Sequence, residues 1–161
     1  MQFHAIGTIR TPYLTEAPYQ PVREDKGEFK IILNEDLVSG LQGLEKFHYI
    51  YVIYYLDRVP TGPPLTLVNP PWAEDVQVGL FASRAPHRPN PIGVSIVALK
   101  KIDHNILYTS GLDVYDQTPL LDIKPYIQDL DSKQDANLGW LNFNNREDRE
   151  HLLLHIKGKP H

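Results

Sequence analysis

The sequence predicts a mainly β protein, an antiparallel barrel or sandwich with a few peripheral helices. Three observations favour this class. Many short segments are rich in β-branched and aromatic side chains, which is typical of strands. Proline-rich corners separate these segments. The chain also lacks a βαβ alternation and a glycine-rich phosphate loop, so the nucleotide-binding folds that depend on those features are not expected.

The first half of the chain contains three expected strands and one expected helix. The strands are residues 4–11, residues 28–33 and the long segment HYIYVIYYLD, residues 48–57. The last of these is almost entirely β-branched and aromatic, which predicts a strand buried on both faces. Asn34 is a suitable N-cap for a helix from Glu35 to Phe47. Gly40 and Gly43 lie inside that helix, and each costs about 1 kcal/mol relative to alanine.

The second half contains shorter strands and a C-terminal helix. The expected strands are residues 65–68, 75–83, 93–103, 106–110 and 120–124. His104 and Asn105 form the tight turn of a hairpin. The helix is expected over residues 146–157, where His151 and His155 lie four residues apart. Because the sequence there is HLLLH, without the glutamate of metalloproteases, we expect helix histidines and no metal site.

Length, charge and composition exclude several classes of protein. The 161 residues suit one domain, and the absence of cysteine excludes disulfides and thiolate metal sites. No signal peptide and no apolar run long enough to cross a bilayer is visible, so a cytoplasmic protein without membrane contact is expected. The net charge of −4 is only mildly acidic. A local basic patch could therefore still bind nucleic acid.

The segment FASRAPHRPNPIGVS, residues 81–95, places cationic side chains on a backbone stiffened by three prolines. Proline fixes φ and lowers the entropy of a loop before a ligand arrives. The guanidinium groups of Arg84 and Arg88 suit a carboxylate or a phosphate, and the amide of Asn90 suits the loop backbone or a base edge. The alternative is an ordinary corner between strands, with its arginines paired to surface acids.

A second unusual segment, GLDVYDQTPLLDIKPY at residues 111–126, carries three aspartates around a Thr-Pro turn. Carboxylates at such positions act as general bases, bind ribose hydroxyls or face a cation. The alternative is local turn chemistry, in which the side chains of Asp113 and Asp116 satisfy nearby backbone groups.

These two segments together resemble the signature segments of the TrmO family, also called the TsaA or VirR-like family. GLEKFHYIYVIYYLD and IGTIRTPY resemble two further family segments, so the resemblance covers roughly residues 4–126 in the same order. It implies an S-adenosylmethionine-dependent tRNA methyltransferase built on a β-barrel and active as a homodimer. It also implies a single TrmO-like domain over residues 1–161, without the C-terminal extension of the larger members.

The resemblance assigns several residues to the methyl donor. They are Pro21, Val22, Asp57, Arg58, Arg84, Val94, Gln117, Thr118, Pro119 and Leu120. Three positions depart from the usual family pattern. Ser83 replaces a threonine, Gln117 replaces a glycine, and Asp57 stands where many members have histidine.

The implied substrate is the exocyclic nitrogen of threonylcarbamoyl-adenosine next to the anticodon. An anticodon loop presents unpaired bases at low cost. His87, Arg88, Asn90, Lys124 and Tyr126 are the expected tRNA contacts. Methyl transfer needs an in-line arrangement and the loss of one proton from the nitrogen. Asp113 and Asp116 are the candidate bases, with water as the alternative acceptor.

Two other functions fit the same residues. The first is a barrel that binds S-adenosylmethionine as a sensor or carrier without methylating tRNA. The second is a barrel that binds RNA without catalysis. Donor binding separates the second from the other two, and methyl transfer separates the enzyme from the sensor.

Overall fold

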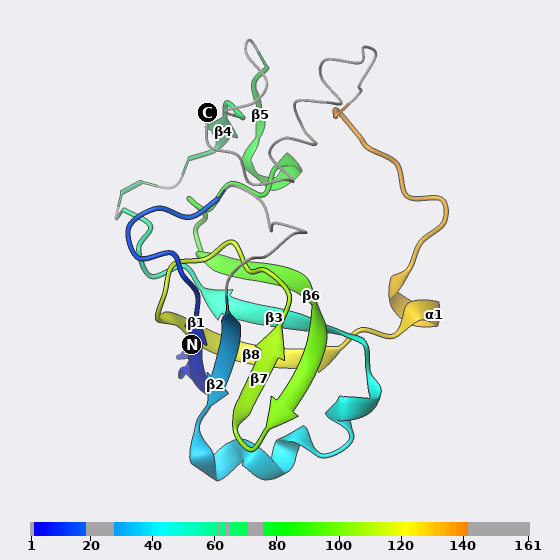
Figure 1. The fold of residues 1–161 in the computed structure, drawn as a ribbon. Helices are drawn as coiled ribbons and strands as arrows, with labels where there is room; N and C mark the ends of the chain where they lie inside the picture. Colours follow the sequence, from blue (N-terminus) through cyan, green and yellow to red (C-terminus); the bar gives the residue numbers. More distant parts are fainter. Residues whose placement is uncertain (1, 19–27, 61, 64, 71–75, 142–161) are drawn as a thin grey trace.

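The computed structural model describes residues 2–18, 28–60, 62–63, 65–70 and 76–141. Six antiparallel strands close into a barrel in the order β1-β2-β7-β6-β3-β8, which confirms the predicted fold class (Figure 1). The barrel strands are β1 (Gly7–Arg10), β2 (Phe29–Leu33), β3 (Tyr49–Tyr55), β6 (Ile92–Asp103), β7 (Ile106–Thr109) and β8 (Thr118–Pro125). A separate two-stranded sheet consists of β4 (Leu67–Val68) and β5 (Val78–Gly79).

Short helical segments lie outside the barrel. They are the 3₁₀ helices η1 (Glu35–Leu41), η2 (Leu44–Lys46) and η3 (Leu80–Ala82), and the single-turn helix α1 (Gln128–Asp131). Figure 1 shows η1 and η2 below one end of the barrel, whereas β4 and β5 project beyond the other end. None of the helices in the described part of the chain is long and apolar enough to span a membrane.

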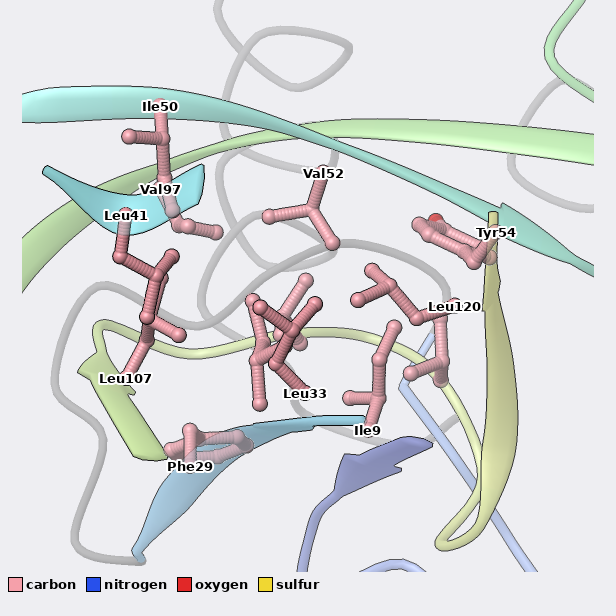
Figure 2. Packing of buried hydrophobic residues seen from close by; sticks show 13 residues of the cluster. Ile9, Phe29, Leu33, Leu41, Ile50, Val52, Tyr54, Val97, Leu107 and Leu120 are labelled. Carbon is pink, nitrogen blue, oxygen red and sulfur yellow. The ribbon is translucent and has the colours of Figure 1, made fainter. Parts of the chain in front are cut away.

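The core consists of the side chains that point into the barrel. Ile9, Ile31, Leu107 and Leu120 have no exposed surface. Figure 2 shows these inward side chains packed across the interior, with Leu41 closing the end near η1. Burying a side chain of this size contributes roughly 1.5–3 kcal/mol, so the alternating pattern of the strands is enough to fix their register.

The prediction that residues 48–57 are buried on both faces was wrong. In β3, Ile50, Val52 and Tyr54 are buried, but Tyr49 is 51% exposed and Tyr55 is 43% exposed. The reason is the closed barrel, in which one face of each strand looks into the core and the other looks outward. The apolar outer side chains of β3 therefore form part of the molecular surface.

The predicted helix over residues 35–47 was also wrong. The segment forms two 3₁₀ helices, and Gly43 between them has a φ of +88°. This left-handed conformation suits glycine and interrupts an α-helix. The expected strand at residues 75–83 is reduced to β5 followed by η3 among its described residues. The expected helix over residues 146–157, with His151 and His155, lies outside the described residues.

Candidate functional site

The two unusual segments meet at one cavity at the end of the barrel where β3 ends and β6 and β8 begin. The cavity has a volume of about 360 Å³. It is lined by Phe3, Ala5, Tyr55, Asn90, Pro91, Ile92, Pro119 and Leu121. Ligand pockets usually have volumes of about 300–1,000 Å³ and mostly apolar walls. Segments far apart in the sequence thus form one small, mainly apolar pocket with Asn90 in its wall.

Arg88 holds the proline-rich loop together from within. Its Nη1 donates to the carbonyl of Ser83 at 3.0 Å and, at 3.5 Å, to the carbonyls of Leu80 and Ala85. Its guanidinium also lies over the ring of Phe81, 5.7 Å from the ring centroid. Because Nη1 contacts three carbonyls of the loop itself, Arg88 stiffens the loop that carries Arg84 and Asn90.

Arg84 lies in the same loop, but unlike Arg88 it is exposed to solvent. Its charge acts on Asp113 and Tyr54, and it lowers the pKa of both groups relative to burial alone. Two residues before it, the carbonyl of Ala82 accepts a hydrogen bond of 2.6 Å from Nε1 of Trp140. The backbone near Arg84 is therefore held while its guanidinium faces solvent.

A chain of polar side chains lies inside the barrel mouth. Oη of Tyr54 and Oγ of Ser95 are 2.9 Å apart, and Oγ of Ser95 donates to Oδ1 of Asp113 at 3.4 Å. Burial raises the pKa of Asp113 to about 6, against the opposing effects of its own backbone N–H, Ser95 and Arg84. A carboxyl with this pKa changes protonation near neutral pH, which is what a general base requires.

Asp116, the other candidate base, is buried and accepts hydrogen bonds through Oδ1. Its Oδ1 accepts a hydrogen bond of 2.7 Å from Nε of Arg10 and another of 3.1 Å from the backbone N–H of Thr11. Burial alone would raise the pKa of Asp116, but these hydrogen bonds outweigh it and hold the pKa below its usual range. This carboxylate resists taking up a proton and serves to join β1 to the segment before β8.

Arg58 reaches the same segment from the end of β3. Its guanidinium donates to the carbonyls of Leu14 and Asp116, at 2.8 Å and 3.0 Å. It also lies over the ring of Tyr115, 4.8 Å from the ring centroid. Arg58 therefore ties two loops together at the barrel end, and Asp57 beside it is an exposed turn residue.

The turn from Gln117 to Leu120 presents alternating residues to the outside. Gln117 has a φ of +70°, so it adopts the left-handed conformation that a glycine would adopt at this place. The hydroxyl of Thr118 donates to the Tyr115 carbonyl at 2.8 Å, and Leu120 is fully buried. Only the side chains of Gln117 and Pro119 therefore face outward, and Pro119 lines the cavity.

The structure does not bring all the expected RNA contacts together. His87 and Asn90 lie in the loop at the end of β3 near Tyr55, whereas the backbone N–H of Tyr126 donates to the carbonyl of Tyr49 at the other end of β3. At about 3.3 Å per residue, these places are roughly 20 Å apart along the strand. Lys124 lies near Tyr126, and its Nζ is 2.7 Å from Oδ2 of Asp122. Pro21 and Val22 lie outside the described residues.

The sequence analysis did not single out Tyr54 and Ser95. Ser95 donates a hydrogen bond to Asp113, and Tyr54 is in turn hydrogen-bonded to Ser95. Tyr54 was one of several aromatic residues in β3, and Ser95 was the last residue of the proline-rich segment. Since β3 and β6 were both expected as strands, a pairing of Tyr54 with Gly93 would have placed Ser95 two residues away on the same face. The register that makes this pairing was not available from the sequence.

Comparison with known proteins gives one consistent family. Residues 8–132 match the family model described as the tRNA-methyltransferase O N-terminal domain. A probable S-adenosyl-L-methionine-binding protein of Archaeoglobus fulgidus is 38% identical over 160 residues, which cover 98% of this chain and 43% of that protein. The tRNA (adenine(37)-N6)-methyltransferase of Escherichia coli is 36% identical over 148 residues, which cover 86% of this chain and 63% of the enzyme.

A solved structure gives the same result for the fold. The crystal structure of TrmO superimposes with a TM-score of 0.73 at 33% identity, and the match covers 87% of this chain and 64% of that one. This chain thus spans less than two thirds of the length of each of these three proteins.

Proposed function

The chain belongs to the family of tRNA-methyltransferase O N-terminal domains, and from this premise we propose that it is an S-adenosylmethionine-dependent methyltransferase. The proposed substrate is the exocyclic nitrogen of the adenosine, with or without a threonylcarbamoyl group, next to the tRNA anticodon. Two observations support the proposal: residues of the proline-rich segment and of the segment around the Thr-Pro turn line one cavity, and Asp113 of the second segment, which contacts Ser95 of the first, has a pKa of about 6.

The residues at this end of the barrel fit the methyl donor. A mainly apolar cavity of about 360 Å³ with one tyrosine and two prolines in its wall suits an adenine ring. The exposed guanidinium of Arg84 suits the carboxylate of the donor, since arginine binds carboxylates through two parallel hydrogen bonds. When bound, the donor supplies a methyl group activated by a sulfonium charge. Among the residues assigned to the donor, Arg58 and Thr118 contribute by holding the surrounding loops.

Asp113 is the proposed proton acceptor. As the nitrogen–methyl bond forms and the carbon–sulfur bond breaks, the electron pair stays on sulfur and the nitrogen must lose one proton. The carboxylate of Asp113 takes that proton, since its pKa of about 6 leaves it ionised at neutral pH but still basic. Asp116 is not carried forward as a base, because Arg10 and Thr11 stabilise its ionised form.

The outer face of β3 and β6 supports a homodimer. Tyr49, Tyr55, Val94 and Ile96 are each between 43% and 52% exposed on this face. The strands place Val94 opposite Ile53 and Ile96 opposite Tyr51, so the apolar side chains form one continuous stripe. Exposed stripes of this kind mark protein interfaces, and a two-fold dimer would bury the same stripe on both subunits. Val94, expected to contact the donor, would then lie between the subunits.

Methyl transfer is tested with tRNA that lacks this methylation and a donor with a deuterated methyl group, followed by mass spectrometry of the nucleosides. We expect the label on the exocyclic nitrogen of the adenosine next to the anticodon. Asp113→Asn should slow transfer by about 10²-fold or more, as loss of a general base does. Asp129→Asn, on the exposed helix α1, should leave the rate unchanged. Absence of label with a tRNA preparation that the E. coli enzyme methylates would contradict the proposal.

The names of two archaeal relatives state S-adenosyl-L-methionine binding alone, so the second candidate function is binding of the donor without methyl transfer. Calorimetry with the donor tests this directly. Donor binding with no transfer to any tRNA would identify a sensor or carrier. Absence of donor binding would contradict both of these functions, and an RNA-binding barrel without catalysis would be the remaining alternative.

A further inference from the structure

Asp113 does not stand alone at the barrel mouth, because two hydroxyl groups from neighbouring strands lead to it. Within the described residues, Ser95 is the one side chain that donates a hydrogen bond to the Asp113 carboxylate. Ser95 belongs to β6 and is 7% exposed, and its Oγ lies 2.9 Å from Oη of Tyr54 on β3. Tyr54 is 5% exposed. The hydroxyls of Tyr54 and Ser95 and the carboxylate of Asp113 thus form one chain of hydrogen bonds, and both hydroxyl residues are buried.

The direction of the hydrogen bonds follows from the number of protons. An ionised carboxylate only accepts, so the single hydroxyl proton of Ser95 points to Asp113. The Ser95 oxygen then accepts from the hydroxyl of Tyr54. Tyr54 keeps its proton, because burial and the charge of Asp113 raise its pKa well above the usual value. The chain therefore donates from Tyr54 through Ser95 to Asp113.

The same three groups can also accommodate a protonated Asp113. Each hydroxyl has one proton and spare lone pairs, so both hydroxyls can rotate and reverse the chain. Protonated Asp113 would then donate to Ser95, and Ser95 would donate to Tyr54. Both states of the carboxyl keep the two hydrogen bonds between the three groups, but the reversed arrangement leaves the Tyr54 proton without an acceptor among the described residues, so the network favours the ionised carboxylate.

We propose that Ser95 and Tyr54 are positioning residues for Asp113, which fix the orientation of its carboxylate and stabilise its ionised form before it takes the substrate proton. The proposal rests on the proposed methyltransferase function. Gly93 makes the arrangement possible, since Tyr54 lies across it and extends along β6 to Ser95. The Ser95–Asp113 distance of 3.4 Å is long for a hydrogen bond, and such contacts often shorten when substrate binds.

The pKa of Asp113 depends on the charged and titratable groups that face it, so these groups determine how the substitutions Ser95→Ala and Tyr54→Phe change that pKa. They are Arg84 from the loop after η3, Tyr54 from β3 and the hydroxyl of Ser95 from β6. Ser95→Ala removes one stabilising contact of the carboxylate and leaves the Arg84 charge in place. The pKa of Asp113 should therefore rise, and the pH at which transfer falls to half its maximum should rise equally. Tyr54→Phe should shift both in the same direction by less, because Ser95 remains.

The first measurement is a carbon-13 titration of the Asp113 carboxyl in the protein without donor or RNA, with the signal assigned from Asp113→Asn. We expect an upward shift of about half a unit or more in Ser95→Ala, which corresponds to a threefold change in the ionisation constant. Ser95→Thr keeps the hydroxyl and should restore the wild-type titration. Unchanged titration in both Ser95→Ala and Tyr54→Phe would overturn the proposal.

The second measurement is the pH profile of methyl transfer for the same variants. A shift of the acid limb that matches the carboxyl titration supports the positioning role, and a shifted titration with an unchanged profile overturns it. If the wild-type protein transfers no methyl group at all, the proposed function fails. The carboxyl titration would still report whether the hydroxyl chain acts on Asp113.

Discussion

A β-carbon on Gly93 would lie 2.0 Å from Cε2 of Tyr54, far inside van der Waals contact. The two residues are cross-strand partners in β6 and β3, and the tyrosine ring occupies the space that a side chain at residue 93 would need. This packing directs the Tyr54 hydroxyl to Ser95, two residues further along the same face. The glycine that follows the proline-rich loop therefore has a packing role that determines the geometry of the polar chain.

Gly93→Ala should destabilise the protein by about 1–3 kcal/mol, as overpacking of a core does. Tyr54 is only 5% exposed, so its ring is enclosed by the protein and a methyl group at residue 93 would have to displace it. Urea unfolding measures the change. Gly79→Ala is the matched control, since nothing lies within 4 Å of its added carbon and its φ of −62° suits alanine. Equal stability of the two variants would contradict this packing.

Asp116 should make stability depend on pH in acid. Its pKa is lowered in the folded protein, so its contribution is complete above the unfolded value of about 3.9 and is lost as the pH falls through the lower folded value. In Asp116→Asn, the free energy of unfolding should be about 1–3 kcal/mol lower at neutral pH and should vary less in acid. Urea midpoints between about pH 2 and 6 test this.

Asp103 provides the control for that experiment. It pairs with Lys101 at 2.8 Å, but both side chains are about 60% exposed, so water and salt weaken the pair. Asp103→Asn should give a curve close to that of the wild type. If the free energy of unfolding varied with pH in the same way in the wild type and in Asp116→Asn, the Arg10–Asp116 contact would not be the source of the acid dependence.

The two arginines of the proline-rich loop should behave differently. Arg84→Ala should weaken binding of S-adenosylmethionine by roughly 10- to 100-fold, the effect of losing hydrogen bonds to a charged group, and should leave loop amide exchange unchanged. Arg88→Ala should speed hydrogen exchange of the loop amides, because the loop loses the contacts of Nη1 with three of its carbonyls. Calorimetry and hydrogen exchange together separate the two roles. Unchanged donor affinity in Arg84→Ala would remove this residue from the site.

Self-association should depend on the outer face of β3 and β6. Ile96→Glu places a charge in the middle of the apolar stripe and should convert a dimer to a monomer, as measured by analytical ultracentrifugation. Leu37→Glu is the control, since Leu37 is also an exposed aliphatic residue but lies in η1 at the end of the barrel (Figure 1). A wild-type monomer, or a dimer that Ile96→Glu leaves intact, would refute the proposed interface.

Much of the fold followed from local patterns. The strands at residues 28–33, 93–103 and 106–110 and the hairpin turn at His104 and Asn105 were predicted nearly as they occur. Alternation and turn residues carry this information within a few positions of the chain. The exposure of the outward face of β3 was not predicted. Aromatic residues are typical both of a strand covered by a second layer and of a barrel strand with one face exposed, so the sequence of β3 does not distinguish the two.

The assignment of site residues stays a prediction, and how far the sequence could give their surroundings differs between residues. The two segments were singled out from the sequence, and the structure places them in contact: Asn90 and Pro119 line one cavity, and Ser95 donates to Asp113. The roles of Arg58 and Arg88 could not be predicted, because they depend on carbonyl groups that tertiary structure brings within reach. The same holds for Asp116.

Gln117 stands where the family usually has glycine, and a side chain at this position works against a tight turn. Its φ of +70° shows that the turn forms all the same, and its backbone N–H donates to the carbonyl of Ile9 at 2.9 Å. Gln117 pays a small conformational cost for that turn, because a non-glycine residue in this region is strained.

The most direct test of the account is a crystal structure of the protein with S-adenosylhomocysteine, the demethylated form of the donor. The account predicts that the molecule lies between residues 81–95 and 111–126, with its carboxylate on the guanidinium of Arg84 and its sulfur facing Asp113. Density for the molecule at any place that touches neither segment would contradict it.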